Sequence, residues 1–396
     1  MTGAAVAALE VRRELGVYDC GQPGPTLLVL AGIHGNEPAG VHAVRAVLRR
    51  LQELELPLRG RLVALAGNLP ALASGKRFLA RDLNRGWSEP ALAALAARDP
   101  EAPGADPEDR EQRQLLHRFE QVLRTASGPV AFVDLHTSSA DGPPFLCLAD
   151  TIDNRRLGLS TGVPILLGIE ETIDGASLEW FAKCGVLAMA VEGGRHEHPA
   201  TVGNHEAVLW LVLEHLRMLP SGSVDSEAQR RHLAAAVGAT PPIVEIVRRH
   251  AITEADAFRM RPGFTNFAPV VKGAVLAEDR NGPIRAPHDC LVMLPLYQRL
   301  GDDGFFLARP VRRFWLHVAS GLRRLGLPAL VSWLPGVRRD PDDPLTILVD
   351  PRVARWFVTE VFHLLGFRKE RRRGALLAFS RRWSRPENAR LGRGGW

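Results

Sequence analysis

Long apolar runs and paired cysteines are both missing from this chain of 396 residues. No apolar run approaches the roughly 20 residues that a membrane-spanning helix needs. The four cysteines are widely spaced and form no CxxC pair, so the sequence predicts neither a disulfide framework nor a thiolate zinc site. The first nine residues are small and apolar but lack a basic region, which argues against a secretory signal. We therefore expect a cytoplasmic protein.

Lysine is scarce, and the basic charge is concentrated near the C-terminus. Only four of the 50 basic residues are lysine, and residues 311–396 carry 18 Lys and Arg against 7 Asp and Glu. This segment could lie on an anionic membrane, contact nucleic acid, or pack as a helical extension on the rest of the chain or on another subunit. We favour the packed extension. We expect no nucleic-acid partner, because no nucleic-acid-binding motif is present, and peripheral membrane contact and oligomer formation stay open.

Apolar runs and helical patterns alternate over the first 219 residues. Thr26–Ala31 is a continuous apolar run, and strand patterns recur at 61–66, 130–135, 145–148, 163–169 and 186–191, with helical patterns at 38–54, 109–125 and 204–219. This order favours an α/β fold with a mainly parallel sheet flanked by helices.

The remaining residues change character twice. We expect a catalytic domain at 1–219, a linker at 220–240, a small all-β domain with frequent turn signals at 241–310, and a basic, Arg-rich, mostly helical extension at 311–396.

Three predicted strands end in residues that could bind a metal ion. His34 and Glu37 follow the first apolar run, His136 ends a second strand and Glu192 a third. His-x-x-Glu alone is a weak signal, but two His and one Glu form a known catalytic zinc set, and a neighbouring carboxylate such as Glu192 can serve as general base to a zinc-activated water. Asp134 lies on the same face of its strand as His136 and could orient that ring.

Arginines cluster between the strands in Arg77–Arg85 (RFLARDLNR). Guanidinium groups bind carboxylates and stabilise oxyanions, which suggests a substrate that carries a carboxylate. Arg81 is at least as well explained as a solvated residue. The cluster His196-Glu197-His198 is better explained as a surface loop, because three metal ligands are already present.

Four motifs in this order resemble the succinylglutamate desuccinylase/aspartoacylase family. They are GIHGNEPAG (32–40), RFLARDLNR (77–85), VDLHT (133–137) and AVEGG (190–194), and the resemblance covers roughly residues 25–310. The resemblance implies that this protein is a zinc amidohydrolase with a zinc-carboxypeptidase-like α/β fold and a smaller β domain. It implies one zinc ion per chain at His34, Glu37 and His136, with Glu192 as base.

The same resemblance gives roles to the residues around that zinc ion. It implies that Arg77 polarises the scissile carbonyl, that Asn84 and Arg85 hold the substrate carboxylate and that Asn68 lines their pocket. Asp82 would support the metal shell, and Tyr297 is the best counterpart of a substrate-binding tyrosine. The chain departs from aspartoacylases before Glu192, where Lys183 stands instead of an extra arginine, so acetylaspartate is a doubtful substrate.

We therefore expect a zinc-dependent hydrolase that cleaves the amide bond of an N-acyl amino acid or a similar small carboxylate. A zinc carboxypeptidase acting on peptides is the alternative within enzymes, because the metal ligands are the same. A binding protein that attaches to surfaces or membranes and carries a degenerate site is the alternative from another class. The sequence identifies neither the acyl group nor the amino acid.

Overall fold

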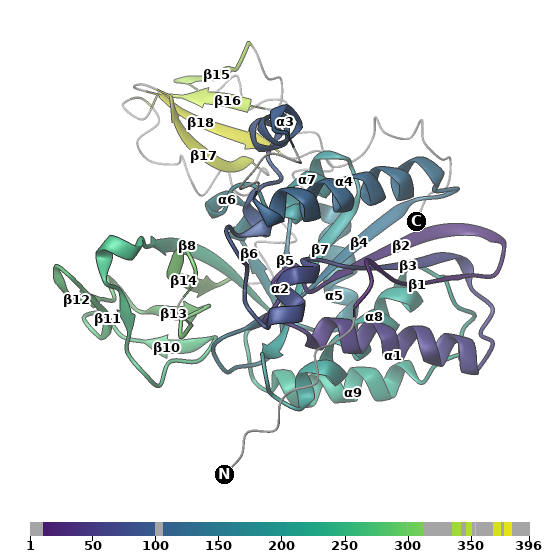
Figure 1. The fold of residues 1–396 in the computed structure, drawn as a ribbon. Helices are drawn as coiled ribbons and strands as arrows, with labels where there is room; N and C mark the ends of the chain where they lie inside the picture. Colours follow the sequence, from purple (N-terminus) through teal and green to yellow (C-terminus); the bar gives the residue numbers. More distant parts are fainter. Residues whose placement is uncertain are drawn as a thin grey trace.

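A computed structural model describes residues 11–99, 106–298, 300–311, 335–341, 346–350, 353, 367–373 and 376–381. In these residues one mixed sheet runs through the molecule, and helices pack on both of its faces (Figure 1). The strand order is β1-β3-β2-β4-β7-β5-β6-β8-β14-β13-β10. The predicted α/β class is confirmed. No helix in the described ranges is both long and apolar enough to cross a membrane.

The central strand pairs of this sheet are parallel. β2 pairs with β3 and β4, and β4 pairs with β7, all in parallel, whereas β1 closes the edge as an antiparallel strand. Leu27 to Ala31 are completely buried, because helices cover both faces, and this explains the uninterrupted apolar run. The bounds are β1 (Glu14–Asp19), β2 (Gln22–Ala31), β3 (Arg59–Ala66), β4 (Val130–Ser138), β5 (Phe145–Leu148), β6 (Ile165–Leu167), β7 (Leu187–Arg195), β8 (Ile243–Ala251), β10 (Ala268–Val270), β13 (Cys290–Met293) and β14 (Asp303–Pro310).

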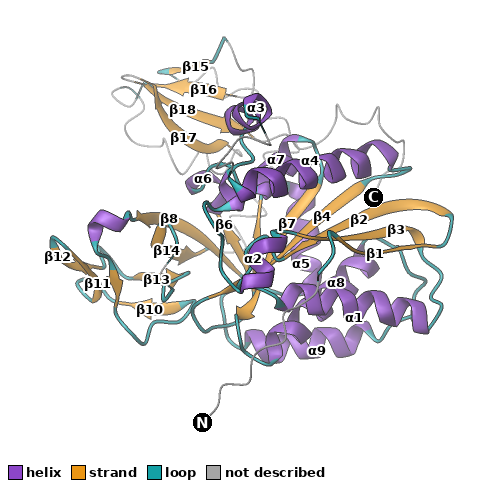
Figure 2. Cartoon of the chain, viewed as in Figure 1, coloured by secondary structure: helices purple, strands orange, loops and turns teal. Residues whose placement is uncertain are grey.

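Two apolar clusters attach the main helices to opposite faces of the sheet (Figure 2). One cluster includes side chains of α1, α5, α8 and α9, and the other includes side chains of α4, α6 and α7. The helices are α1 (Ala39–Glu53), α2 (Leu69–Ser74), α3 (Glu89–Ala97), α4 (Pro107–Thr125), α5 (Ile152–Thr161), α6 (Ile169–Thr172), α7 (Ser177–Lys183), α8 (Ala200–His215) and α9 (Ser226–Val237), with short 3-10 turns at Leu83–Arg85 and Glu254–Asp256.

The helix after the first motif begins where the sequence indicates. Pro38 is the N-cap residue of α1, where its missing N–H costs no helical hydrogen bond. Val41, Val44, Leu48 and Leu51 are buried at helical spacing against the sheet. The position of Glu37, directly before the helix, is therefore fixed by the packing of α1.

The predicted linker and β domain are closely joined to the first part of the chain. Residues 226–237 form α9, which packs on α8. β8 pairs in parallel with β6, so β8, β14, β13 and β10 extend the main sheet. A separate three-stranded sheet contains β9 (Arg259–Met260), β11 (Val275–Asp279) and β12 (Gly282–Arg285). The expected all-β character of 241–310 agrees with these strands, while the domain division stays a prediction.

The C-terminal extension contains strands in the parts that the structure describes. β15 (Val337–Arg339), β16 (Thr346–Val349), β18 (Leu376–Arg381) and β17 (Phe367–Arg373) form an antiparallel sheet in that order. The helical prediction is wrong for these segments. The run Thr-Ile-Leu-Val of β16 is buried throughout and rich in β-branched residues, which favour a strand. The Arg-rich motifs at 312–315 and 323–324 lie outside the described residues.

Candidate metal centre and substrate pocket

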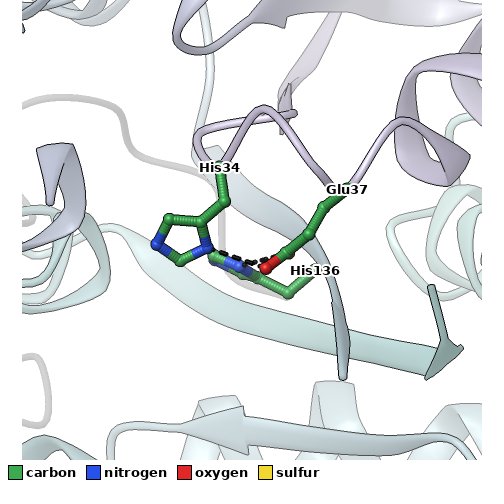
Figure 3. A group of neighbouring side chains, drawn as sticks. All are labelled: His34, Glu37 and His136. Carbon is green, nitrogen blue, oxygen red and sulfur yellow. Dashed lines mark hydrogen bonds and ion pairs between the residues drawn. The ribbon is translucent and has the colours of Figure 1, made fainter. Parts of the chain in front are cut away.

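His34, Glu37 and His136 meet at the carboxyl ends of β2 and β4 (Figure 3). One ligand atom from each residue lies within 4.8 Å of the others, and all three side chains are buried. Nδ1 of His34 lies 2.9 Å from Oε1 of Glu37, and Nδ1 of His136 lies 3.2 Å from Oε2. Neighbouring parallel strands deliver their ends to one edge of the sheet, which explains how residues about a hundred positions apart come together.

Glycines allow the backbone around His34 to approach its neighbours. A side chain at Gly35 would place its Cβ atom 2.0 Å from the carbonyl carbon of Ala71, and Gly32 has a φ of 71°. The Gly35 N–H donates a hydrogen bond of 3.0 Å to the carbonyl of Arg77. The glycines of the first motif are therefore needed for close packing of this turn.

The outer nitrogen of each histidine faces a buried carboxylate. Nε2 of His34 lies 3.1 Å from Oδ1 of Asp82, and Nε2 of His136 lies 3.2 Å from Oδ2 of Asp134. Ser177 donates a hydrogen bond of 2.8 Å to the same Asp134 oxygen. Such contacts hold Nε2 as the protonated nitrogen and leave both Nδ1 atoms for a metal ion. The contact predicted between Asp134 and His136 is present.

Glu37 is held as a carboxylate in this buried place. Burial raises its pKa, but His34 and His136 outweigh that effect and hold the pKa of Glu37 well below its usual range. The N–H of Thr137 donates a hydrogen bond of 2.9 Å to Oε2. Two imidazole nitrogens and one carboxylate on one side of a cavity fit the ligand set that proteins use for zinc.

Arg77, Asn84 and Arg85 line the cavity beside these residues. Arg77 donates a hydrogen bond of 2.8 Å to Asp82, and its Nη1 lies 3.6 Å from Oε1 of Glu37. Burial lowers the pKa of Arg77, but Asp82 and Glu37 raise it overall, so the guanidinium stays charged. Asn84 accepts a hydrogen bond of 2.8 Å from the N–H of Ser177.

Hydrogen bonds to the first turn of α4 hold the segment from Leu79 to Arg85 in place. Glu108, which is fully buried, accepts hydrogen bonds from the backbone N–H groups of Leu79 at 2.7 Å and Ala80 at 3.0 Å. The guanidinium of Arg81 also contacts α4, where it forms an ion pair of 2.7 Å with Asp109. Arg81 thus holds this segment in place and is not among the described residues that line the cavity.

Glu192 lines the cavity from β7, next to His136 in the strand register. Burial raises its pKa to about 7; the charge of His136 opposes this rise, and the charge of Glu37 adds to it. Its Oε2 atom is buried and accepts no hydrogen bond within the described part of the chain. A carboxyl group with this pKa, an unused oxygen and a place beside the metal ligands suits a general base.

Two residues that the resemblance suggested have other contacts. The amide of Asn68 caps α2 and donates a hydrogen bond of 3.0 Å to Glu108, so this side chain is used within the fold. The hydroxyl of Tyr297 bonds to the backbone of Arg261 and Phe264. Neither residue is among the described residues that line the cavity, so a substrate role for them stays a prediction that these contacts do not support.

Several residues near the candidate site were not predicted from the sequence. Ser177 and Asp303 lie far from the motifs along the chain, and no short spacing points to them. Glu108 precedes the predicted helical pattern at 109–125, although an acidic residue directly after Asp106-Pro107 is a signal for the first turn of a helix, and α4 begins at Pro107.

The fold and the site define an α/β protein with a buried group of two histidines and one glutamate that could hold a metal ion at the carboxyl edge of its sheet. Residues 23–164 match the family described as Succinylglutamate desuccinylase/Aspartoacylase catalytic domain. This stretch contains the three metal-ligand candidates and Arg77, Asn84 and Arg85. The part of the chain that matches, residues 23–164, belongs to the succinylglutamate desuccinylase/aspartoacylase family.

Individual relatives agree with this assignment. A succinylglutamate desuccinylase of Burkholderia orbicola (strain MC0-3) is 28% identical over 278 residues, which cover 67% of this chain and 74% of the relative. The crystal structure of succinylglutamate desuccinylase from Vibrio cholerae has a TM-score of 0.54 at 16% identity, covering 74% of this chain and 83% of that one. Murine aminoacylase 3 has a TM-score of 0.51 at 19% identity, covering 73% and 96%. The two structures show that the fold is shared.

Proposed function

We propose that this protein is a zinc-dependent amidohydrolase that removes the acyl group from an N-acyl amino acid or a similar small carboxylate. The observation that carries the proposal is the convergence of His34, Glu37 and His136 on one point, with Glu192 beside them in the same cavity. The names of the relatives, desuccinylase and aminoacylase, support the reaction class.

The zinc ion, when bound by these three residues, would supply a Lewis acid that lowers the pKa of water and polarises a carbonyl group. Asp82 and Asp134 keep the two histidine rings oriented through Nε2. Because both supports are buried carboxylates, the rings cannot turn without breaking a charged contact.

Residues of the chain would carry the remaining steps. Arg85 and Asn84 would bind the substrate carboxylate, and Arg77 would donate hydrogen bonds to the acyl oxygen as negative charge develops there. Glu192 would accept a proton from the attacking water and pass it to the leaving nitrogen. The products would be a carboxylic acid and a free amino acid.

The walls of the cavity support a small substrate over a peptide. Leu294, Leu296, Gln298 and Gly301, which lie between β13 and β14, line the cavity opposite the motif residues. The cavity that they line has a volume of about 150 Å³. A cavity of this size would admit a short acyl amino acid more readily than an extended chain.

The test is a hydrolysis screen of acetyl-, succinyl- and longer acyl-amino acids with zinc supplied. We expect release of free amine from at least one substrate, with loss of turnover after chelation and recovery after zinc is restored. Glu192→Gln should abolish turnover. The matched control Glu197→Gln changes an exposed residue five positions away and should leave turnover unchanged. Hydrolysis of peptides but of no acyl amino acid would favour the carboxypeptidase alternative.

A further inference from the structure

The charges around the cavity restrict which N-acyl amino acids the proposed reaction could use, and this inference rests on the proposed function. Among the described residues that line the cavity, Arg77 and Arg85 are the two with a fixed positive charge. Arg77 is already engaged with Asp82 and Glu37. A substrate with several carboxylates, such as an N-succinyl derivative of an acidic amino acid, would need more unengaged cations than this wall presents.

Arg85 is itself partly neutralised by Asp303. Its Nη2 atom lies 3.1 Å from Oδ2 of Asp303, although the two residues are 218 positions apart in sequence. Asp303 begins β14, lines the cavity and also pairs with Arg249. The Nη2 atom of Arg85 is thus paired with a carboxylate of the protein, while Nη1 donates a 3.1 Å hydrogen bond to the carbonyl of Asn84 and lies 4.0 Å from Oδ2 of Asp82. A guanidinium engaged on both sides has room for a single carboxylate of the substrate at most.

Asp303 is paired with Arg85 and Arg249, and its carboxylate occupies the place beside Arg85 that a second substrate carboxylate would need. Asp302 lines the same part of the cavity with a second acidic side chain. A further carboxylate on the substrate would lie close to these like charges, and like charges in a partly buried site repel strongly. The acidic pair therefore opposes dicarboxylate substrates.

Apolar side chains form another part of the cavity lining, beside Glu192. Ala190 lies two residues before Glu192 and on the same face of β7, and Cys147 of β5 is its cross-strand partner. This apolar wall comprises Cys147, Ile169, Ile173, Leu178, Ala190 and Phe306. An ionised group pressed against it would lose its hydration without gaining a partner, whereas an alkyl group gains by leaving water.

We propose that the cavity selects N-acyl amino acids that carry one carboxylate and an uncharged, apolar acyl group, and that Asp303 is the residue that disfavours a second carboxylate. Substrate binds with its carboxylate at Arg85 and its acyl chain against the apolar wall. The relatives in sequence are named desuccinylases, and a succinyl group carries a carboxylate of its own. The selection proposed for this chain therefore differs from the reaction in their name.

Matched acyl groups on one amino acid test the selection. N-succinylalanine and N-(4-methylpentanoyl)alanine have acyl groups of almost equal shape, which differ in the terminal carboxylate. We expect kcat/KM to be at least tenfold higher for the 4-methylpentanoyl compound. Along the series acetyl, propanoyl and butanoyl, kcat/KM should rise by roughly three- to fourfold per methylene until the wall is covered. A preference for the succinyl compound would overturn the proposal.

Asp303→Asn tests the residue assigned to this selection. It removes the charge while keeping the size of the side chain, so the ratio between the two compounds should shrink by about tenfold or more. The control Asp289→Asn changes an exposed carboxylate of the β domain, and the ratio should stay unchanged. An unchanged ratio in Asp303→Asn would contradict the role of Asp303.

Failure of the proposed function can be told apart from failure of this inference. If no acyl amino acid is hydrolysed with zinc present, the reaction class is wrong. Calorimetric binding of the same two compounds to Glu192→Gln then still decides the charge preference. Tighter binding of the succinyl compound would overturn it, and Arg299, which lies outside the described residues, would be the first cation to replace in that case.

Discussion

The Nε2 atom of His34 lies 3.1 Å from Oδ1 of Asp82, whose other oxygen accepts a 2.8 Å hydrogen bond from Arg77. One buried carboxylate thereby orients a metal-ligand candidate and the guanidinium expected to face the acyl oxygen. Burial raises the pKa of Asp82, but Arg77 and His34 hold it well below its usual range, so the group is charged at neutral pH. The proposed metal site and the proposed substrate site are therefore coupled through this side chain.

Replacing Asp82 tests that coupling. Asp82→Asn should weaken zinc affinity by roughly 10- to 100-fold, because His34 loses the partner that fixes its ring. Zinc affinity is measured by competition with a chromogenic chelator. Asp109→Asn serves as control, since Asp109 also pairs with an arginine but lies outside the cavity lining. Equal zinc affinity in wild type and Asp82→Asn would show that the contact does not support the metal ligand.

Glu108 should hold the substrate-binding segment in place. Glu108→Gln weakens a buried carboxylate that accepts hydrogen bonds from Leu79, Ala80 and Asn68. We expect the free energy of unfolding to fall by about 1–3 kcal/mol and kcat/KM to fall with zinc content retained. Urea unfolding and steady-state kinetics measure the two effects. Glu120→Gln, on the exposed face of the same helix, should change stability by no more than about 0.5 kcal/mol.

The pKa of Glu192 predicts the acidic limb of the pH profile. A general base must be deprotonated, so kcat/KM should rise with pH through the pKa of Glu192, which burial raises to about 7. A divalent cation favours the carboxylate, so the midpoint in the zinc enzyme should lie below that of chelated protein. Infrared difference spectra between wild type and Glu192→Gln follow this carboxyl group directly. An identical midpoint with and without zinc would place Glu192 away from the metal.

Tyr297 is a residue for which the family resemblance and the structure of this chain predict different roles. Its hydroxyl bonds to the backbone of Arg261 and Phe264, outside the cavity lining. Tyr297→Phe should therefore leave KM within about twofold of wild type. Arg85→Lys keeps the charge but loses the two-pronged geometry, so it should raise KM by about tenfold or more. A large rise of KM in Tyr297→Phe would restore the substrate role that the resemblance suggested.

The sequence predicted the parts of the fold whose patterns are local. Thr26–Ala31, the helix after Pro38 and the strand at 145–148 were predictable because burial on both faces, helical spacing and strand length each leave a direct trace. The strands of the C-terminal extension were not. Their arginine-rich sequence suggested a packed helical extension, whereas β16 is a buried strand that pairs with β18. Pairing partners leave no mark in a single sequence.

The candidate site likewise contains residues that the sequence predicted and residues that it did not. His34, Glu37, His136 and Asp134 follow from strand ends and from the two-residue period of a strand. Asp303 and Ser177 do not, because tertiary packing alone brings them to Arg85 and Asp134. Asn68 was assigned to the pocket from its place in the motif order, and in the structure its side chain caps α2, so a substrate role for it stays a prediction.

Zinc content and turnover, measured on the same preparations, test the central claim most directly. Wild-type protein should hold about one zinc ion per chain and hydrolyse an acyl amino acid. Glu37→Gln should lose both the ion and the activity, because Glu37 lies between the two histidines. Glu192→Gln should keep the ion and lose the activity. Full turnover in Glu192→Gln, or turnover without metal in Glu37→Gln, would contradict the account.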